Sequence, residues 1–306
     1  MKTSRKFVFI GGVPISGTSL VQKIISNHSE VFGGLEFDHL PRLMHLHKVL
    51  SLIIENRRQE AFYDKPTLNK AIKHLIESLL FDAARRNGKS ILSEKSPRNV
   101  LAFKNLFALW PESKFIFIVR DPRAVYNSFR NVQIKAIERG VDNVTYVKYF
   151  LSNFLTIERL LREGERFWDS HKENCYLVYY EELTADPVFE VKKICDFIGI
   201  QFEAEMLDTQ KSDIQSSLIN SDTAKISAFY DSTSYDRPIQ ASEKDKWRSQ
   251  LNSLQIAQAE SYFSRQGIKV LKKYNLDSRS SYLKFVARLS LFLFTLKRKI
   301  NAPTFN

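Results

Sequence analysis

The chain has 306 residues, of which 43% are hydrophobic and 12% aromatic, so it can bury a large core and is not a disordered chain. Its 10 glycines and 9 prolines are too few for a collagen-like or linker-like protein. The 46 lysines and arginines exceed the 34 acidic residues and give a net charge of +12. This charge favours anionic partners: a phosphate- or sulfate-bearing cofactor, nucleic acid or an anionic membrane.

Short apolar runs alternate with helical stretches along most of the chain. Strands are predicted at residues 7–10, 90–93, 114–119 and 175–179, and helices at 16–26, 40–60, 66–87, 100–109, 122–130, 146–168, 187–198 and 257–274. This alternation predicts an α/β fold, a P-loop-type parallel sheet sandwiched between helices (α/β/α), in one domain over residues 1–275. Residues 205–245 lack periodicity and are expected to form a long functional loop.

The last segment, residues 276–306, is predicted to be a basic amphipathic tail helix. From Ser281 onward it contains no acid, and its apolar residues recur at helical spacing. Its basic residues are Lys284, Arg288, Lys297, Arg298 and Lys299. Such a helix can pack on the domain, pack on a second subunit in a homodimer, or lie on an anionic membrane as a peripheral contact. No run reaches the ~20 apolar residues of a spanning helix, and residues 7–10 are too short for a signal peptide, so a cytoplasmic protein is expected.

A glycine-rich loop follows the first predicted strand. Residues 12–19 have the P-loop spacing G-x-x-x-x-G-x-[ST] between a strand and the start of a helix. Backbone amides of such a loop and the helix dipole can bind a phosphate group. Thr18 occupies the position of the Walker lysine, which argues against hydrolysis of ATP or GTP.

A second motif follows the strand at residues 114–119. Arg120 comes directly after this strand, and Ser128 lies eight residues later in the next predicted helix. An arginine at the carboxyl end of a strand in an open α/β sheet points toward the ligand crevice, and two helical turns allow Ser128 to face the same cleft. Charge from one residue and a hydrogen bond from the other suit a phosphate group.

Together these two motifs resemble the sulfotransferases that use 3′-phosphoadenosine 5′-phosphosulfate (PAPS), and in particular the protein-tyrosine sulfotransferase branch. The resemblance covers residues 6–275. It is carried by the segments Gly11-Gly-Val-Pro-x-Ser-Gly-Thr-Ser-Leu20, Gly34-x-Glu36, Leu40-Pro41-Arg42, Glu94-Lys95-Ser-Pro97, Tyr179-Tyr180-Glu181-Glu-Leu183 and Arg237-Pro238-Ile-Gln240. It implies transfer of a sulfuryl group to an acceptor hydroxyl, such as a peptide tyrosine or a glycan, with 3′,5′-ADP as the product.

The same resemblance assigns roles to individual residues. It makes Glu36 the catalytic base, with His28 as the next candidate, and Lys95 the cation that neutralises the leaving phosphate. The 5′-phosphosulfate is expected to bind to Pro14, Ser16, Gly17, Thr18 and Ser19, and the 3′-phosphate to Arg120 and Ser128. Tyr180 is expected to contact the nucleotide, and Lys246 the phosphate side of the cofactor. Ser232 is a further cofactor residue that matches the family motif after a shift of one residue.

One departure from the family concerns the loop, where Ile15 replaces the usual arginine. We expect Lys95 or another basic residue to supply the missing charge. No metal site is predicted: His45 and His47 are two residues apart and would face different sides of a helix, and Cys175 and Cys195 are too few for a cysteine-rich site.

Other functions remain open at this point. The acceptor alternatives are a carbohydrate, a lipid or a small alcohol. A P-loop nucleotide kinase would need the missing lysine and an acidic metal ligand. A basic nucleic-acid- or membrane-binding protein would gather its basic residues in a stripe, whereas here they are spread along the chain, so no nucleic-acid partner is expected.

Overall fold

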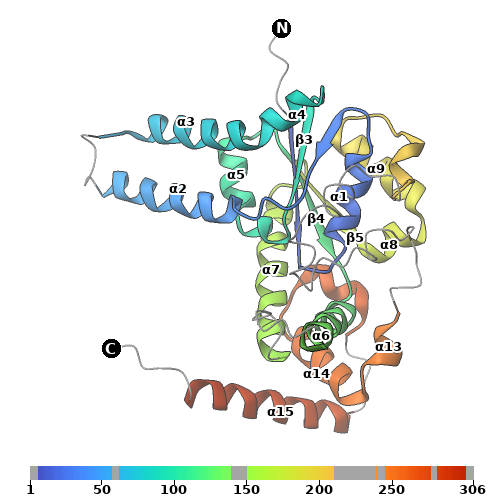
Figure 1. Ribbon diagram of the computed structural model, residues 1–306. Helices are drawn as coiled ribbons and strands as arrows, with labels where there is room; N and C mark the ends of the chain where they lie inside the picture. Colours follow the sequence, from blue (N-terminus) through green and yellow to red (C-terminus); the bar gives the residue numbers. More distant parts are fainter. Residues whose placement is uncertain are drawn as a thin grey trace.

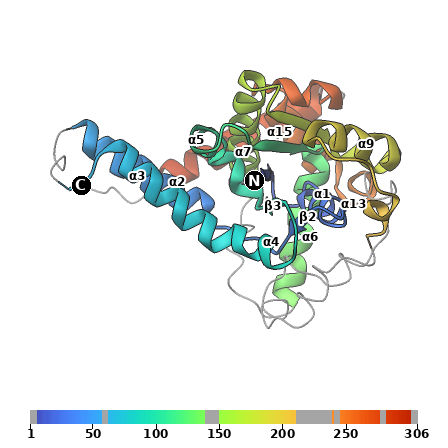
Figure 2. The same cartoon turned by 90° about the horizontal axis from the view of Figure 1, so that it is seen from above.

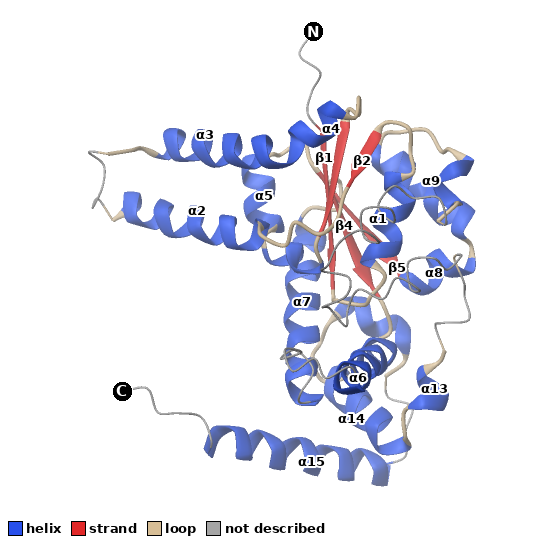
Figure 3. Cartoon of the chain, viewed as in Figure 1, coloured by secondary structure: helices blue, strands red, loops and turns tan. Residues whose placement is uncertain are grey.

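A five-stranded parallel sheet forms the centre of the computed structural model, which describes residues 6–56, 62–138, 150–209, 239, 245–276 and 281–300 (Figures 1 and 3). The strand order is β2-β3-β1-β4-β5, and every pairing is parallel. The strands are β1 (Lys6–Gly12), β2 (Val31–Gly33), β3 (Ile91–Lys95), β4 (Lys114–Val119) and β5 (Cys175–Tyr179). Helices cover both faces, so the predicted α/β/α fold is confirmed.

Alternation along the strands sends side chains to two separate cores. Phe7 and Phe9 of β1 lie in one cluster with Phe115 of β4. Their neighbours Val8 and Ile10 lie in the other cluster. Because both faces of these strands are buried, the strands consist of almost continuous apolar residues, which made them recognisable in the sequence.

The aliphatic face of the sheet is covered by a small group of helices. These are α1 (Thr18–Ser26), α8 (Tyr180–Ala185), α9 (Pro187–Ile198) and the 3₁₀ turn η3 (Ala204–Leu207). The aromatic face is covered by η2 (Pro97–Leu101), α5 (Phe103–Leu109) and α7 (Phe150–Ser170). Past the carboxyl ends of the strands lie α6 (Pro122–Glu138), α13 (Trp247–Gln250), α14 (Ser253–Phe263), η5 (Lys269–Tyr274) and α15 (Ser281–Ile300) (Figure 1).

A two-helix arm projects from the body (Figures 1 and 2). It consists of α2 (Leu40–Glu55) and α3 (Lys65–Ile76), and α3 continues through the π-helical η1 (Glu77–Phe81) into α4 (Asp82–Arg86). Buried His47 on α2 contacts Asn69 Oδ1 on α3 through Nε2 at 2.7 Å, while His45 is exposed. The two histidines therefore face different sides of the helix, as their spacing predicts.

The structure also differs from the predicted elements. The helix expected over 257–274 ends at Phe263, and a 3₁₀ turn begins at Lys269, because Gly267 between them has a positive φ of 64°. The short strand β2 and the short helix α8 were not predicted. Most of the expected loop at 205–245 lies outside the described residues. None of the described helices combines the length and apolar character needed to cross a membrane.

Candidate active site

Three parts of the predicted site, the glycine-rich loop, Lys95 and Arg120, lie where the strand order reverses. The chain places β3 on one side of β1 and β4 on the other, so the loops after these three strands lie at one edge of the sheet, the edge where open α/β sheets have their ligand crevice. The glycine-rich loop follows β1, Lys95 ends β3, and Arg120 follows β4. Segments up to about a hundred residues apart in the chain are thus brought to one edge of the sheet.

The glycine-rich loop has a conformation that few residues adopt. Gly17 has a φ of 104°, and a Cβ atom there would lie 2.4 Å from Cδ2 of Tyr180, so only glycine fits. Ile15 also has a positive φ, 65°, which is strained for a β-branched residue. The Arg120 guanidinium donates to the Ile15 carbonyl oxygen at 3.0 Å, which stabilises the loop in this shape.

The start of α1 suits an anion. Among the described residues no side chain caps this helix, and its first turn contains no acid, so its positive end faces the loop. The hydroxyl of Ser16 is fully buried and has no hydrogen-bond partner among the residues that the structure describes. A buried hydroxyl left unpaired costs about 1–3 kcal/mol. An anion in the loop would accept a hydrogen bond from it, and these residues therefore fit a bound phosphate or phosphosulfate group.

Lys95 and Glu36, the two predicted catalytic residues, form a close ion pair beside this loop. The Lys95 side chain is only 4% exposed, and its Nζ also donates to Ser19 Oγ at 3.0 Å. Glu36 is more open, at 19% exposure. The structure thus places a buried cation against the first turn of α1 and a more accessible carboxylate next to it.

A buried carboxylate, Glu94, holds the loop that carries Glu36. Its Oε1 accepts hydrogen bonds from the Phe37 amide at 3.2 Å and from Ser96 Oγ at 2.7 Å, and its Oε2 accepts one from Asn99. Ser96 Oγ in turn accepts the Asp38 amide at 2.9 Å. Burial raises the pKa of Glu94, and the hydrogen bonds from Ser96, Asn99 and the Phe37 amide oppose this shift. The sequence analysis gave Glu94 no role, although a charged residue inside an apolar strand was a signal for one.

Arg120 and Tyr180, two of the predicted cofactor residues, lie against each other after β4 and β5. The Arg120 guanidinium carbon lies 4.3 Å from the centre of the Tyr180 ring, which also contacts Gly17. Ser128 is half-buried on α6, two turns further on. Pro14 is half-buried in the loop. Lys246 is exposed at the start of α13, and Ser232 lies outside the described residues.

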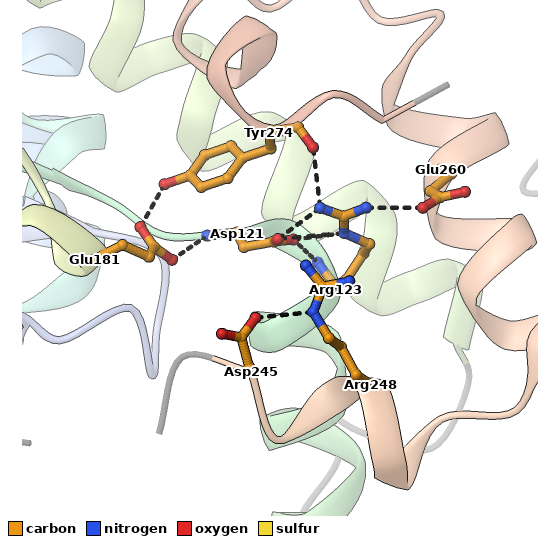
Figure 4. Close-up of polar contacts among 7 residues, drawn as sticks. All are labelled: Asp121, Arg123, Glu181, Asp245, Arg248, Glu260 and Tyr274. Carbon is orange, nitrogen blue, oxygen red and sulfur yellow. Dashed lines mark hydrogen bonds and ion pairs between the residues drawn. The ribbon is translucent and has the colours of Figure 1, made fainter. Parts of the chain in front are cut away.

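Behind Arg120, a second arginine organises the loop between β4 and α6 (Figure 4). Arg123 is buried and pairs with Asp121 at 2.8 Å and with Glu260 of α14 at 2.7 Å. Its Nη2 also donates to the Tyr274 carbonyl oxygen at 2.9 Å. This arginine therefore joins the loop that carries Arg120 to the C-terminal helices.

Tyr274 and Glu181 complete this network (Figure 4). The Tyr274 hydroxyl donates to one oxygen of Glu181 at 2.7 Å, and the other oxygen accepts the Asp121 amide at 3.0 Å. Burial and the charge of Glu181 raise the pKa of Tyr274, so it remains a neutral donor. Because Glu181 adjoins Tyr180, this network also fixes the ring that faces Arg120.

Trp247 docks the segment that bears Lys246. Its buried ring lies between the guanidinium groups of Arg123, at 4.3 Å, and Arg248, at 4.5 Å. Arg248 also pairs with Asp245 at 2.9 Å (Figure 4). No role is predicted for Trp247 from the sequence, and these contacts position its neighbour Lys246 at the start of α13.

His28, the alternative base, is wrong for that role. Its buried ring accepts the Glu30 amide on Nδ1 at 3.0 Å, and its Nε2 contacts the Gln201 carbonyl oxygen at 2.8 Å. It follows α1 and precedes β2, whose first residue pairs with the first residue of β3, so it lies at the amino edge of the sheet. Both ring nitrogens therefore serve the fold, at the edge opposite the crevice.

No cluster of three or more histidine, cysteine, aspartate or glutamate side chains able to hold a metal ion occurs in the described part of the chain. Cys175 and Cys195 are both buried free thiols on opposite faces of the sheet.

Comparison with known proteins agrees with this arrangement. The model of the sulfotransferase family matches residues 8–204. Protein-tyrosine sulfotransferase A of Caenorhabditis elegans is 27% identical over 245 residues, which are 79% of this chain and 60% of the relative. The protein-tyrosine sulfotransferase of Drosophila melanogaster is 31% identical over 202 residues, which are 65% of this chain and 39% of the relative. The chain thus spans about two fifths to three fifths of the length of these relatives.

Solved structures show the same fold. A sulfotransferase domain from the curacin biosynthetic pathway covers 80% of this chain and 91% of its own length with a TM-score of 0.57 and 21% identity. A sulfotransferase domain from a Synechococcus olefin synthase covers 85% and 94% with a TM-score of 0.53 and 20% identity. Together with the family match, these results confirm the resemblance that the sequence motifs predict.

Proposed function

This chain belongs to the sulfotransferase family, and we propose that it transfers a sulfuryl group from PAPS to an acceptor hydroxyl. The observation that carries the proposal is the convergence of three features at one sheet edge. They are a lysine-free glycine-rich loop, the buried hydroxyl of Ser16, which has no hydrogen-bond partner in the described part of the chain, and the buried cation Lys95 against Ser19. A nucleoside-triphosphatase would need the loop lysine that Thr18 replaces.

The cofactor would lie across the crevice. Pro14, Ser16, Gly17, Thr18 and Ser19 would surround its 5′-phosphosulfate. Arg120 and Ser128 would hold the 3′-phosphate, with Tyr180 and Lys246 beside the nucleotide. Ser232 is retained from the family motif alone. The position of Arg120 over the Tyr180 ring supports this assignment. The same ring lies against Gly17, so the guanidinium is held close to the glycine-rich loop.

When bound, PAPS supplies the sulfuryl group and a phosphate leaving group. Glu36 would accept the proton of the acceptor hydroxyl, which positioned carboxylates do efficiently. Lys95 would stabilise the negative charge on the leaving phosphate. Their ion pair supports both roles, because it holds the base and the cation in contact next to the loop.

The structure also supports compensation for the missing loop arginine. Arg120 reaches the loop at the Ile15 carbonyl, and Lys95 reaches it at Ser19. Two cations, one at the end of β3 and one directly after β4, therefore contact the loop from the two sides of β1. We propose that Lys95 supplies the charge that arginine provides in other family members.

For the acceptor, we propose a peptide tyrosine. The support is the similarity to protein-tyrosine sulfotransferases of a nematode and a fly. A glycan, another carbohydrate, a lipid or a small alcohol are the alternatives.

Binding and transfer assays test the proposal. Calorimetry should show tight binding of 3′,5′-ADP and weak binding of ATP, with negligible ATP hydrolysis. Labelled PAPS should then be offered with tyrosine peptides, glycans, lipids and alcohols, with Glu36→Gln as the inactive control. Equal affinity for ATP and 3′,5′-ADP would contradict the cofactor, whereas transfer only to a non-peptide would contradict the acceptor.

A further inference from the structure

Helix α15 contacts the body through small residues. Ala287 is fully buried, and Ser290 accepts a hydrogen bond from Gln258 of α14 at 2.9 Å. Ser290 also donates to the Ala287 carbonyl oxygen, which keeps its side chain close to the helix. In Figure 1 the helix lies below α14 and extends outward past it. One face of α15 is therefore occupied by α14.

The opposite face of α15 carries an aromatic stripe, which we define as Tyr282, Phe285, Leu289 and Phe292. Their spacing of three, four and three residues puts them on one side of a helix. They are between 47% and 75% exposed. Large apolar side chains that gather on one exposed helix face mark an interaction surface.

The basic residues beside the stripe indicate which kind of partner the stripe binds. Arg288 is exposed next to the stripe, and Lys284 lies one turn before it. The sequence adds three basic residues at 297–299, and residues 281–306 contain no acid. A basic helix with an aromatic face is the combination that lies in the headgroup region of an anionic membrane. A second copy of the chain would present the same basic helix, with no acid to pair with it.

We propose that α15 docks the protein on an anionic lipid bilayer, with the aromatic stripe in the headgroup region and the basic residues on the lipid phosphates. A helix of 20 residues is ~30 Å long and can lie flat on the surface over its whole length. Helix α15 is bonded to α14, and α14 holds Arg123 through Glu260. Docking of α15 would therefore also hold the candidate active site close to the membrane. This docking is independent of which acceptor the enzyme uses.

Sedimentation of the full chain with lipid vesicles tests this proposal. The protein should pellet with phosphatidylserine-rich vesicles, bind pure phosphatidylcholine vesicles weakly, and be released from the former by salt. The double variant Phe285→Ser/Phe292→Ser should lower partitioning by ~10-fold or more, because two of the four stripe residues are lost. The matched control is Phe62→Ser, which removes an 83% exposed phenylalanine from the arm and should bind as the wild type does.

Two further readouts make each outcome decisive. Circular dichroism and 3′,5′-ADP binding should be the same in wild type and double variant, which excludes unfolding as the cause. Relative to the wild type with its three tryptophans, Phe285→Trp should add emission that shifts to the blue on phosphatidylserine vesicles only. The proposal is overturned if the wild type does not pellet, or if the double variant pellets equally well. It is also overturned if light scattering shows a wild-type dimer that the double variant abolishes, because a second copy would then occupy the stripe.

Discussion

Lys95, the last residue of β3, contacts both Glu36 and Ser19, and so connects the candidate base with the first turn of the phosphate-binding helix. The base and the lysine are 59 residues apart in the chain. The parallel sheet brings them together, because Glu36 follows β2 and β2 lies directly beside β3. This one buried side chain therefore brings a charge to the loop and also contacts the candidate base.

Replacing Glu36 by glutamine should separate catalysis from cofactor binding. The amide keeps the size of the side chain but cannot accept the proton of an acceptor hydroxyl. Turnover should fall by about 10²–10⁴-fold, the usual contribution of a positioned general base, while affinity for 3′,5′-ADP stays near that of the wild type. Steady-state kinetics with calorimetry measures both. Normal turnover would make Glu36 a structural loop residue.

Arg120→Ala should weaken binding of 3′,5′-ADP by about 2–4 kcal/mol, because a buried charge on the ligand loses its partner. The arginine also donates to the Ile15 carbonyl, so a loss of loop structure must be distinguished from a loss of the phosphate contact. Adenosine 5′-monophosphate, which lacks the 3′-phosphate, is the matched ligand. If both nucleotides lose equal affinity in calorimetry, Arg120 supports the loop and does not bind the 3′-phosphate.

Glu94→Gln should change how stability depends on pH. Burial raises the pKa of Glu94 above its ordinary value of 4.5, so the folded state holds this proton more tightly than the unfolded state does. Its contribution to stability is therefore complete below pH 4.5 and is lost as the pH rises through the folded pKa. Urea unfolding of both proteins from acid to neutral pH should show the wild type losing stability relative to the variant. A constant difference would contradict the raised pKa.

Ile15→Arg tests whether Lys95 already compensates for the missing loop arginine. With compensation, the added cation is crowded by Lys95 and Arg120, and turnover should stay equal or fall. Lys95→Ala should then lower turnover strongly. Ile15→Met is the control, since it removes the β-branch at a positive φ without adding charge. A gain in the arginine variant together with no loss in Lys95→Ala would refute compensation.

Arg123→Ala should be among the most destabilising single changes in the described chain. It leaves Asp121 and Glu260 buried without their cation, which costs about 3–5 kcal/mol. Arg166→Ala is the matched control, because its pair with Glu163 lies on the surface and contributes at most about 1 kcal/mol. Thermal unfolding of the two variants should therefore differ clearly. Equal melting temperatures would show that the buried network does not stabilise the fold.

The sheet was predictable because its strands are buried on both faces and so appear as apolar runs flanked by helical periodicity. The three residues of β2 were too few to give such a signal. The helix predicted over 257–274 failed for a different reason. The apolar residues keep their helical spacing past Gly267, but Gly267 itself has a positive φ, which is incompatible with one continuous helix.

The candidate site was predictable only in part. The loop and the Arg120–Ser128 pair have local spacings that indicate a phosphate, whereas the roles of Glu36 and Lys95 came from the family motif. The link from Arg123 to Glu260 joins residues 137 positions apart, and no local pattern encodes such a contact. The hydrogen bonds that hold the Glu36 loop on Glu94 likewise exist only after the chain has folded.

The burial of both cysteines makes the native protein almost inert to thiol reagents. Burial raises the pKa of the Cys195 thiol to about 11 and that of Cys175 further, so little reactive thiolate is present at neutral pH. Cysteines introduced at exposed Phe62 on the arm and Leu289 on α15 would therefore be labelled selectively, without first removing the native ones. Paired spin or fluorescence probes at these positions would report how the arm moves relative to α15 when nucleotide or acceptor binds.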